Sequence, residues 1–303
     1  MKRLLLCICC AFLLTGCTDI RKRLLPDILA VDPATPVQFA AHTSQDTGII
    51  AAYAETALQM PDALRRASGA EISTGHLTML AVSGNPCGIL ETYFQAQMLA
   101  PTCMVLAVPS DACERLRDES LPAPAQLQSA AETGLLPCRT ADAVLADLWG
   151  GSGITALCTQ KADGLTLSLW TKDGCCAVLS DDACRGLALL GKRYESFVFA
   201  ADGITYRLSS MRLHLRIIQG DTLQIALTCK AETEPQLTDA AASRLEEMLC
   251  AAVSETALTA GADLLFLREH AIRSGITAAR SCSQEEWRAL LQSAGCTVTL
   301  AAR

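Results

Sequence analysis

Cys17 is the residue whose type and position best suit a chemical reaction. The chain begins with a basic pair, Lys2-Arg3, and an uncharged apolar stretch follows from Leu4 to Leu14. A basic start, a short apolar core and a small residue before a cleavage point are the parts of an export signal, and this core is too short to span a bilayer. Gly16 supplies the small residue and Cys17 supplies a nucleophilic thiol. The order therefore predicts a signal peptide over residues 1–16.

The four residues Leu14-Thr15-Gly16-Cys17 resemble the lipobox of bacterial lipoproteins. In those proteins the cysteine sulfur takes a diacylglycerol, and cleavage then leaves this cysteine as the first residue. The resemblance implies lipidation at Cys17 and a domain tethered to the outer face of a membrane, because buried acyl chains hold a soluble domain at a bilayer. An ordinary secretory signal that happens to contain a cysteine is the alternative.

Beyond this segment the sequence offers few arrangements that could do catalysis. The glycine-rich stretch Gly150-Gly151-Ser152-Gly153 lacks the spacing of a nucleophile elbow and the ending of a phosphate-binding loop, so it predicts a flexible bend. The histidines are scattered without an H-E-x-x-H pair, and His214 between Arg212 and Arg216 is expected on a solvated strand face. We therefore expect no catalytic residues, no cofactor and no enzymatic activity.

Cysteine is frequent, with 16 in the chain. Three lie within the signal and Cys17 is the lipidation candidate, so twelve remain. Zinc and iron–sulfur sites favour Cys-x-x-Cys pairs, and none occurs outside the signal, so no metal site is predicted. Thiols in apolar runs such as Cys103-Met104-Val105-Leu106 are expected to pack as small hydrophobic side chains. The sequence leaves the disulfide state open.

The composition indicates packed domains in an acidic protein. Half of the 303 residues are apolar, 19% are charged and the formal net charge is −7. Such a chain is not disordered, and its negative charge disfavours binding to nucleic acid. No apolar run reaches the roughly 20 residues that a membrane-spanning helix needs, so a protein with several spans is excluded.

In the first half, strand and helix signals alternate. Residues 28–31 and 37–40 are expected to form a hairpin of two short strands. The Ala-rich stretch Ile50–Leu58 is expected to be helical, and a second short helix is expected from Pro61 to Arg66.

The clearest pattern in this half is a strand–helix–strand unit. Apolar runs at Leu77–Val82 and Cys103–Val108 flank an amphipathic helix that begins at Pro86. Short connections of this kind imply parallel strands with a right-handed crossover. The proline-containing segment 120–138 is expected to be a linker or a surface excursion.

In the second half, alternating patterns predict strands with one buried face. Residues Leu165–Leu169 alternate as a half-buried strand, and Cys176–Leu179 is a further strand before a Ser-Asp-Asp turn. Met211–Ile217 and Leu223–Leu227 alternate on either side of a Gln-Gly-Asp turn, which predicts a hairpin with one face in a core and one in water.

Capping signals mark the helices that follow. Thr238 caps a long helix with apolar residues at 3.6-residue spacing, and Ser283 with Glu286 forms a capping box before another helix. A terminal strand is expected at Cys296–Leu300. These elements predict an α+β fold with mixed or antiparallel sheets and packed helices, in two to three subdomains. Beyond the signal we expect two domains, residues 17–160 and 161–303.

Taken in order, these stretches resemble the Ger(x)C family of spore germination lipoproteins. The resemblance runs along most of the chain and is patchy in residues 18–70 and 120–160. A departure is Thr18, where the family usually has Trp after the lipidated cysteine. The stretches that carry the resemblance are the lipobox followed by Asp19 and Arg21, Gly75-His76-Leu77 before a strand, Cys176 to Leu187, the hairpin Arg212 to Thr228, the long helix, and Ala262-Asp263-Leu264-Leu265 with Trp287.

The resemblance implies a function as well as a fold. Members of the family are non-enzymatic C subunits of nutrient germinant receptors. They lie on the outer face of the spore inner membrane through their lipid anchor, beside two integral-membrane subunits of the A and B types. The resemblance thus implies that this chain acts in nutrient-triggered spore germination through those partners, with Cys17 as its modified residue and with no nucleic acid bound.

Two other classes share some of these features. A solute-binding lipoprotein of an ABC-type importer has the same anchor and a similar size, but it needs two α/β lobes with parallel sheets around a cleft. The predicted hairpin and terminal strand argue against a second lobe of that type. A lipoprotein hydrolase is a third possibility, which the missing nucleophile motif disfavours.

Overall fold

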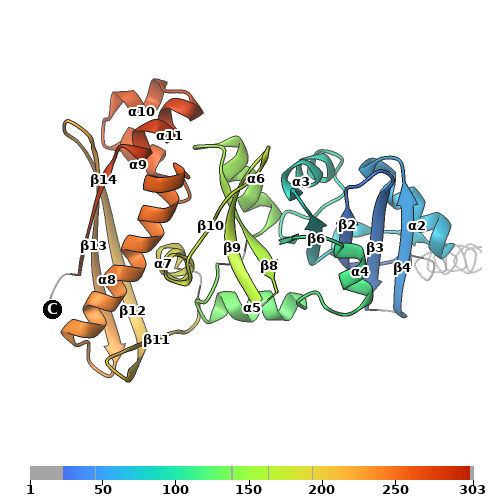
Figure 1. The fold of residues 1–303 in the computed structure, drawn as a ribbon, viewed down its shortest axis with the longest axis horizontal. Helices are drawn as coiled ribbons and strands as arrows, with labels where there is room; N and C mark the ends of the chain where they lie inside the picture. Colours follow the sequence, from blue (N-terminus) through green and yellow to red (C-terminus); the bar gives the residue numbers. More distant parts are fainter. Residues whose placement is uncertain (1–22, 45, 138, 163, 193, 301–303) are drawn as a thin grey trace, which may run out of the picture.

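A computed structural model describes residues 23–300 of the chain, apart from positions 45, 138, 163 and 193. The predicted signal peptide, the lipobox and Cys17 lie outside the described residues. The described residues form an elongated molecule with an eight-stranded sheet, a four-stranded sheet and many helices (Figure 1). This arrangement confirms the predicted α+β fold with mixed sheets and packed helices.

The large sheet combines a parallel centre with antiparallel sides. Strands β2, β6, β7 and β8 run parallel, and hairpin connections add β3 and β4 on one side and β9 and β10 on the other. The predicted parallel pairing is confirmed, with Leu80 opposite Val105. In spatial order the strands are β10 (Gly174–Val178), β9 (Gly164–Thr171), β8 (Thr155–Lys161), β7 (Met104–Val108), β6 (Met79–Ser83), β2 (Pro26–Asp32), β3 (Val37–Thr43) and β4 (Asp46–Ala54).

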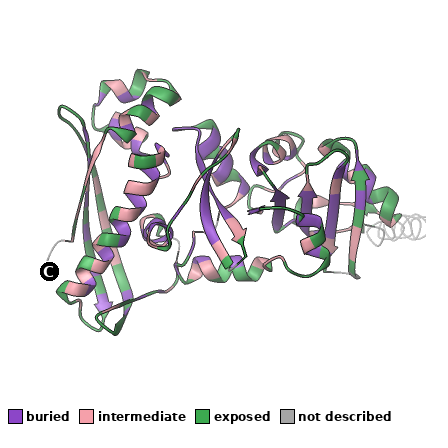
Figure 2. Cartoon of the chain, in the orientation of Figure 1, coloured by how far each residue is buried: buried purple, intermediate pink, exposed green. Residues whose placement is uncertain are grey.

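Helices cover both faces of the large sheet. One face packs against α2 (Met60–Ser68), α3 (Pro86–Gln95) and α6 (Ala141–Trp149). The other packs against α4 (Ala112–Arg117), α5 (Pro124–Glu132) and α7 (Asp181–Gly191). The central strands are therefore buried on both sides (Figure 2). Double burial explains why they appear in the sequence as continuous apolar runs.

A side chain from β2 fixes the position of α4. The carboxylate of Asp32, at the end of that strand, accepts hydrogen bonds from the backbone N–H groups of Ala112 at 2.7 Å and Cys113 at 3.2 Å. It also accepts one from the hydroxyl of Ser83 at 2.6 Å. A carboxylate at this point satisfies backbone donors that the first turn of a helix leaves unpaired.

The helix expected at Ile50–Leu58 is wrong, because most of this stretch belongs to β4. Ala51 and Ala52 pair with Ala40 and Phe39 of β3. Burial alternates along the strand, with Ala52 buried and Tyr53 exposed. Alanine has the highest helix propensity, but the preference amounts to less than about 1 kcal/mol per residue, and pairing with a neighbouring strand overrides it. The short helix expected from Pro61 is confirmed within α2, after a 3-10 turn at Ala57–Gln59.

Two further expectations need correction. Residues 120–138 are not only a linker, since Pro124 begins α5 and the side chains of Leu127 and Ala131 are buried. Strand β9 is not half-buried, because its polar residues Thr166 and Ser168 are as deeply buried as the leucines between them. The burial of Thr166 and Ser168 has a simple cause, since both faces of the sheet are covered and their polarity does not indicate exposure here.

Within the described part of the chain, only one face of the small sheet is covered. β12 forms the predicted antiparallel hairpin with β13, and β14 adds parallel to β13. Helix α8 (Asp239–Val253), capped by Thr238 as predicted, packs on one face, and burial alternates along β13. The four strands are β11 (Phe197–Ala201), β12 (Ile204–Gln219), β13 (Leu223–Glu234) and β14 (Gly295–Leu300).

Short helices complete this end of the molecule. A π-helical turn, Ser254–Ala260, continues α8 and leads into α9 (Leu267–Arg273), α10 (Thr277–Ser281) and α11 (Gln284–Gln292). The capping box of Ser283 and Glu286 is confirmed at the start of α11. A minor pair, β1 (Arg23–Leu24) with β5 (Glu71–Ile72), and a 3-10 turn at Thr74–His76 lie at the other end. None of the helices in the described part of the chain is long and apolar enough to cross a membrane.

Helix α7 connects the two sheets. It lies on the large sheet and crosses α8 of the small sheet at close range, at Gly186 (Figure 1). A Cβ atom at this position would lie only 2.0 Å from the carbonyl oxygen of Met248. The domain boundary expected at 160/161 falls between the last two residues of β8, a strand that pairs with β9 in the large sheet. The two sheets themselves divide near Ser180, where α7 begins.

Candidate functional site

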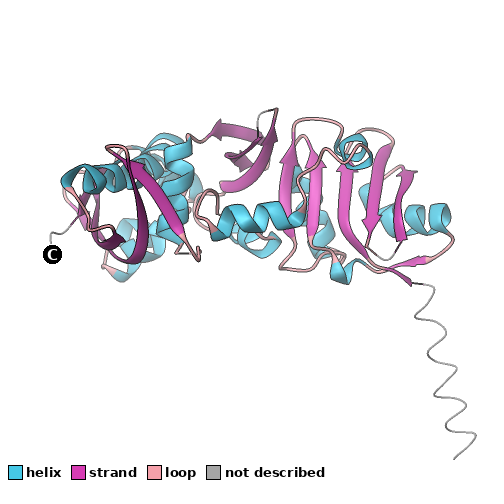
Figure 3. Cartoon of the chain, turned by 90° about the horizontal axis from the view of Figure 1, so that it is seen from below, coloured by secondary structure: helices cyan, strands magenta, loops and turns pink. Residues whose placement is uncertain are grey.

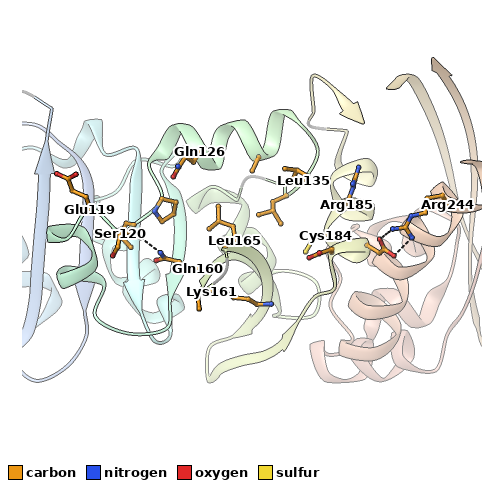
Figure 4. A pocket seen from close by; sticks show the side chains of 18 residues that line it. Glu119, Ser120, Gln126, Leu135, Gln160, Lys161, Leu165, Cys184, Arg185 and Arg244 are labelled. Carbon is orange, nitrogen blue, oxygen red and sulfur yellow. Dashed lines mark hydrogen bonds and ion pairs between the residues drawn. The ribbon is translucent and has the colours of Figure 1, made fainter. Parts of the chain in front are cut away.

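A groove of about 930 Å³ opens where the two sheets meet (Figure 4). Helix α5 and the segment before it form one wall, and the β8–β9 turn forms the floor. Helices α7 and α8 form the other wall with Cys184, Arg185 and Arg244. A cavity of this volume is in the range that small ligands occupy. Its lining mixes leucines, such as Leu135 and Leu165, with charged side chains.

A charge network holds the two helices of the second wall together. The Arg244 guanidinium donates to both carboxylate oxygens of Asp182 and to Glu247 at 3.0 Å. Hydrogen bonding to Asp182 raises the pKa of Arg244 above its ordinary value. The pair joins α8 to α7 in a bidentate geometry, which is the strong form of this contact. Two carboxylates already balance the charge of Arg244, so this network shapes the wall of the groove.

Two other side chains keep polar atoms that the protein leaves unsatisfied. The Arg185 guanidinium lies 4.9 Å from the centre of the Phe197 ring and donates to the carbonyl of Val198. Burial lowers the pKa of Arg185. The amide nitrogen of Gln160 donates to the carbonyl of Ser120 at 2.7 Å. Arg185 Nε and Gln160 Oε1 are buried and make no hydrogen bond with a described residue. Surrounding protein atoms cover both of these polar atoms, so they lie behind the lining of the groove and do not face its open space.

The side chains that line the groove include one buried cysteine, Cys184. Burial raises the pKa of the Cys184 thiol, so it stays protonated and is a weak nucleophile. No histidine occurs among the described residues that line the groove. A nucleophile needs an adjacent base within hydrogen-bonding reach, and the lining does not assemble such a pair.

A second polar cluster, centred on Asp263, ties the two parts of the molecule together. Its buried carboxylate accepts bonds from the backbone N–H groups of Leu267 at 2.5 Å and Arg268 at 2.9 Å, at the start of α9. It also accepts one from the indole N–H of Trp287 at 2.9 Å. The backbone N–H of Asp263 donates to the hydroxyl of Ser152 at 2.9 Å. Burial raises the pKa of this carboxyl group, although these hydrogen bonds act in the opposite direction.

The glycine-rich stretch 150–153 is not the free bend that its composition indicates. Ser152 is buried, and the carbonyl oxygens of the stretch accept bonds from Gln284 and Arg288 of α11. Gly151 and Gly153 have positive φ, and a Cβ at Gly151 would lie 3.2 Å from that of Asp263. Glycine is needed here because the chain turns in the left-handed region against packed side chains.

The remaining candidates from the sequence have different outcomes. Cys17 lies outside the described residues, so its lipidation stays a prediction. His214 lies exposed on β12, as expected. Cys103 is fully buried in the core, where burial raises its pKa to about 12, and it packs as the predicted small hydrophobic side chain. In the described part of the chain, no group of His, Cys, Asp and Glu residues is arranged to hold a metal ion.

The fold is similar to that in the crystal structure of the GerBC protein. The two chains share 12% sequence identity with a TM-score of 0.56, and the likeness covers 90% of this chain and 95% of that one. No family model and no curated protein matches the sequence. At this identity the likeness establishes the fold, a GerBC-like arrangement over almost the whole length.

Two residues of the Asp263 cluster stood out in the sequence, but the groove did not. Asp263 and Trp287 were both among the stretches that resemble the Ger(x)C family, although nothing in their spacing indicates that they touch. Arg185 lies within the Cys176–Leu187 stretch, but nothing in the sequence indicates that it lines one groove with Gln160, because this depends on how α7 packs on the large sheet. An isolated polar residue at the end of an amphipathic strand or helix is normally solvated.

Proposed function

We propose that this chain is a lipid-anchored, non-enzymatic subunit of a spore nutrient germinant receptor, which acts by binding integral-membrane subunits of the A and B types. The observation that carries the proposal is the GerBC-like fold over 90% of the chain. It agrees with the order of the stretches that resemble the Ger(x)C lipoproteins. The lipobox at Leu14-Thr15-Gly16-Cys17 supports anchoring on the outer face of the spore inner membrane.

The chemistry of the described residues fits an adaptor. Its buried polar residues serve structural contacts, such as the cap at Asp32 and the cluster at Asp263. The groove between the sheets presents a protonated thiol and paired charges, without an activated nucleophile. A protein of this kind transmits binding through its surfaces and does not turn over a substrate.

The groove also allows a test of the importer alternative. A solute-binding protein encloses its ligand between two α/β lobes at the ends of parallel strands. Here one wall comes from the large sheet, and the other comes from α7 and α8 beside a largely antiparallel sheet. This geometry favours the receptor subunit over the importer protein.

Anchoring is tested by replacing the lipidated thiol. In the organism that carries the chain, Cys17→Ala should release the protein from the membrane fraction and abolish labelling by a radioactive fatty acid. The matched control is Cys250→Ala, which removes an exposed thiol on α8 and should leave both readouts unchanged. Full membrane retention and labelling of Cys17→Ala would contradict the anchoring part of the proposal.

A further inference from the structure

The outward face of the small sheet is uncovered in the described part of the chain. On β12 the side chains of Arg212, His214 and Arg216 are exposed, and on β13 those of Thr228 and Lys230 are exposed. We call these five residues the basic face. Their neighbours along each strand point inward to the core beneath α8, so the two strands alternate between buried and exposed residues (Figure 2).

Positive charge gathers in the middle of this face, while the carboxylates of Glu232 and Glu234 lie farther along β13 on the same side. Arg212 lies directly opposite Lys230 in the strand register, and His214 lies opposite Thr228. Like charges in directly opposed positions destabilise a sheet. Arg212, Arg216 and Lys230 make no ion pair with a described residue. The arrangement is unusual in a protein whose formal net charge is −7.

Apolar side chains accompany the cations. Ile218, which follows Arg216 on the same side of β12, is 53% exposed, and Val198 on β11 is 43% exposed. Charged and apolar side chains together on an open face are typical of a surface that binds another protein.

We propose that the basic face docks an acidic segment of a partner protein, with carboxylates placed against Arg212, Arg216 and Lys230. Negative charge from the partner would relieve the repulsion within the sheet and would steer association. The inference rests on the proposed function only where it takes this partner to be an integral-membrane receptor subunit.

The position of the face favours a protein over a membrane surface. The small sheet lies at one end of the long axis, and β2–β4 lie at the other, near Arg23, where the described chain begins (Figures 1 and 3). A lipid anchor at Cys17 would therefore hold the opposite end of the molecule at the bilayer.

Site-specific crosslinking of the full chain in its native membrane tests the proposal. A photoreactive side chain at Thr228, in the middle of the basic face, should form adducts with one stretch of another protein, and mass spectrometry should show that this stretch is rich in Asp and Glu. The double variant Arg212→Glu/Arg216→Glu should abolish the adduct, because the charges would then repel. Arg216→Gln, which removes one charge without reversing it, should reduce the yield.

The matched control is Arg66→Glu/Arg280→Glu, which reverses two exposed cations away from the face and should keep the adduct. Thermal unfolding of each variant shows that it folds. Adducts with lipid, with a second copy of this chain or with a stretch poor in acidic residues would overturn the inference, and so would an adduct that survives charge reversal.

The same experiment separates this inference from the proposed function. An acidic stretch in a protein other than an integral-membrane subunit would support the basic face as a docking surface and contradict the proposed partner. Conversely, an adduct with a receptor subunit through a stretch poor in acidic residues would overturn the docking chemistry and leave the proposed function standing.

Discussion

The two sheets of this molecule differ in how many of their faces are covered. The eight-stranded sheet packs helices on both sides, and its central strands β6 and β7 are buried on both faces. The four-stranded sheet packs α8 on one side only, and β13 alternates between buried and exposed residues. The first sheet therefore has its central strands enclosed, whereas the second leaves most of the outward residues of its hairpin exposed.

The largest expected effect tests this difference in coverage directly. In β6, the side chains of Met79 and Leu80 point to opposite faces of the sheet. Met79→Ala and Leu80→Ala should each lower the free energy of unfolding by about 2–5 kcal/mol, because each leaves a cavity in a core. In β13, Leu227→Ala should lower it similarly, while its neighbour Thr228→Ala should change it by less than about 0.5 kcal/mol. Urea unfolding measures all four; a large loss at Thr228 would show that the outward face is covered.

The contact between the two regions gives the next largest effect. Gly186→Ala places a Cβ against the carbonyl oxygen of Met248, so α7 and α8 must move apart, and unfolding should become easier by about 1–3 kcal/mol. Gly191→Ala on the same helix meets no atom within 4 Å and should be neutral or slightly stabilising. Equal thermal stability of the two variants would contradict the close packing of the sheets through these helices.

A smaller, pH-dependent effect belongs to the covered sheet. The buried carboxylate of Asp147 accepts bonds from Arg139 and, at 3.0 Å, from the hydroxyl of Thr155. Burial nevertheless raises its pKa from 3.8 to about 6. Because the folded pKa is the higher one, the contribution of this group to stability is full below the unfolded pKa and is lost as pH rises through about 6.

Lowering the pH from 7 to 5 should therefore raise the free energy of unfolding by about 1 kcal/mol more in the wild type than in Asp147→Asn. Urea unfolding at both pH values measures this difference. The exposed Asp142→Asn on the same helix should behave like the wild type. The same pH dependence in Asp147→Asn and the wild type would show that this carboxyl group is not held in its buried environment.

The smallest effect concerns the open face. Lys230→Gln removes the repulsion with Arg212 across the strands and should raise the free energy of unfolding by about 0.2–1 kcal/mol. The gain should shrink at high salt, since salt screens exposed charges. Lys161→Gln, at the exposed end of β8, is the control and should show no gain. A loss of stability in Lys230→Gln would mean that its charge is compensated within the protein.

The elements that depend on local pattern could be predicted from the sequence. The hairpin of β12 and β13, the cap at Thr238 and the capping box at Ser283 all follow from residues that are close together in the chain. The strand–helix–strand unit around Pro86 was predictable for the same reason.

What could not be predicted depends on partners distant in sequence. The stretch Ile50–Leu58 has the composition of a helix, and only its pairing with β3 makes most of it a strand. Ser152 is held in place by Asp263, which is 111 residues away. The groove is lined by Gln160 of β8 and Arg185 of α7, which are separated in the sequence. None of these contacts leaves a mark in the spacing of neighbouring residues.

Nutrient-triggered germination of spores that lack this chain tests the central claim most directly. The account predicts that deletion slows germination severalfold, that the wild-type gene restores it, and that Cys17→Ala does not, while no hydrolytic activity is lost. Normal germination of the deletion strain, with no related copy present, would contradict the account.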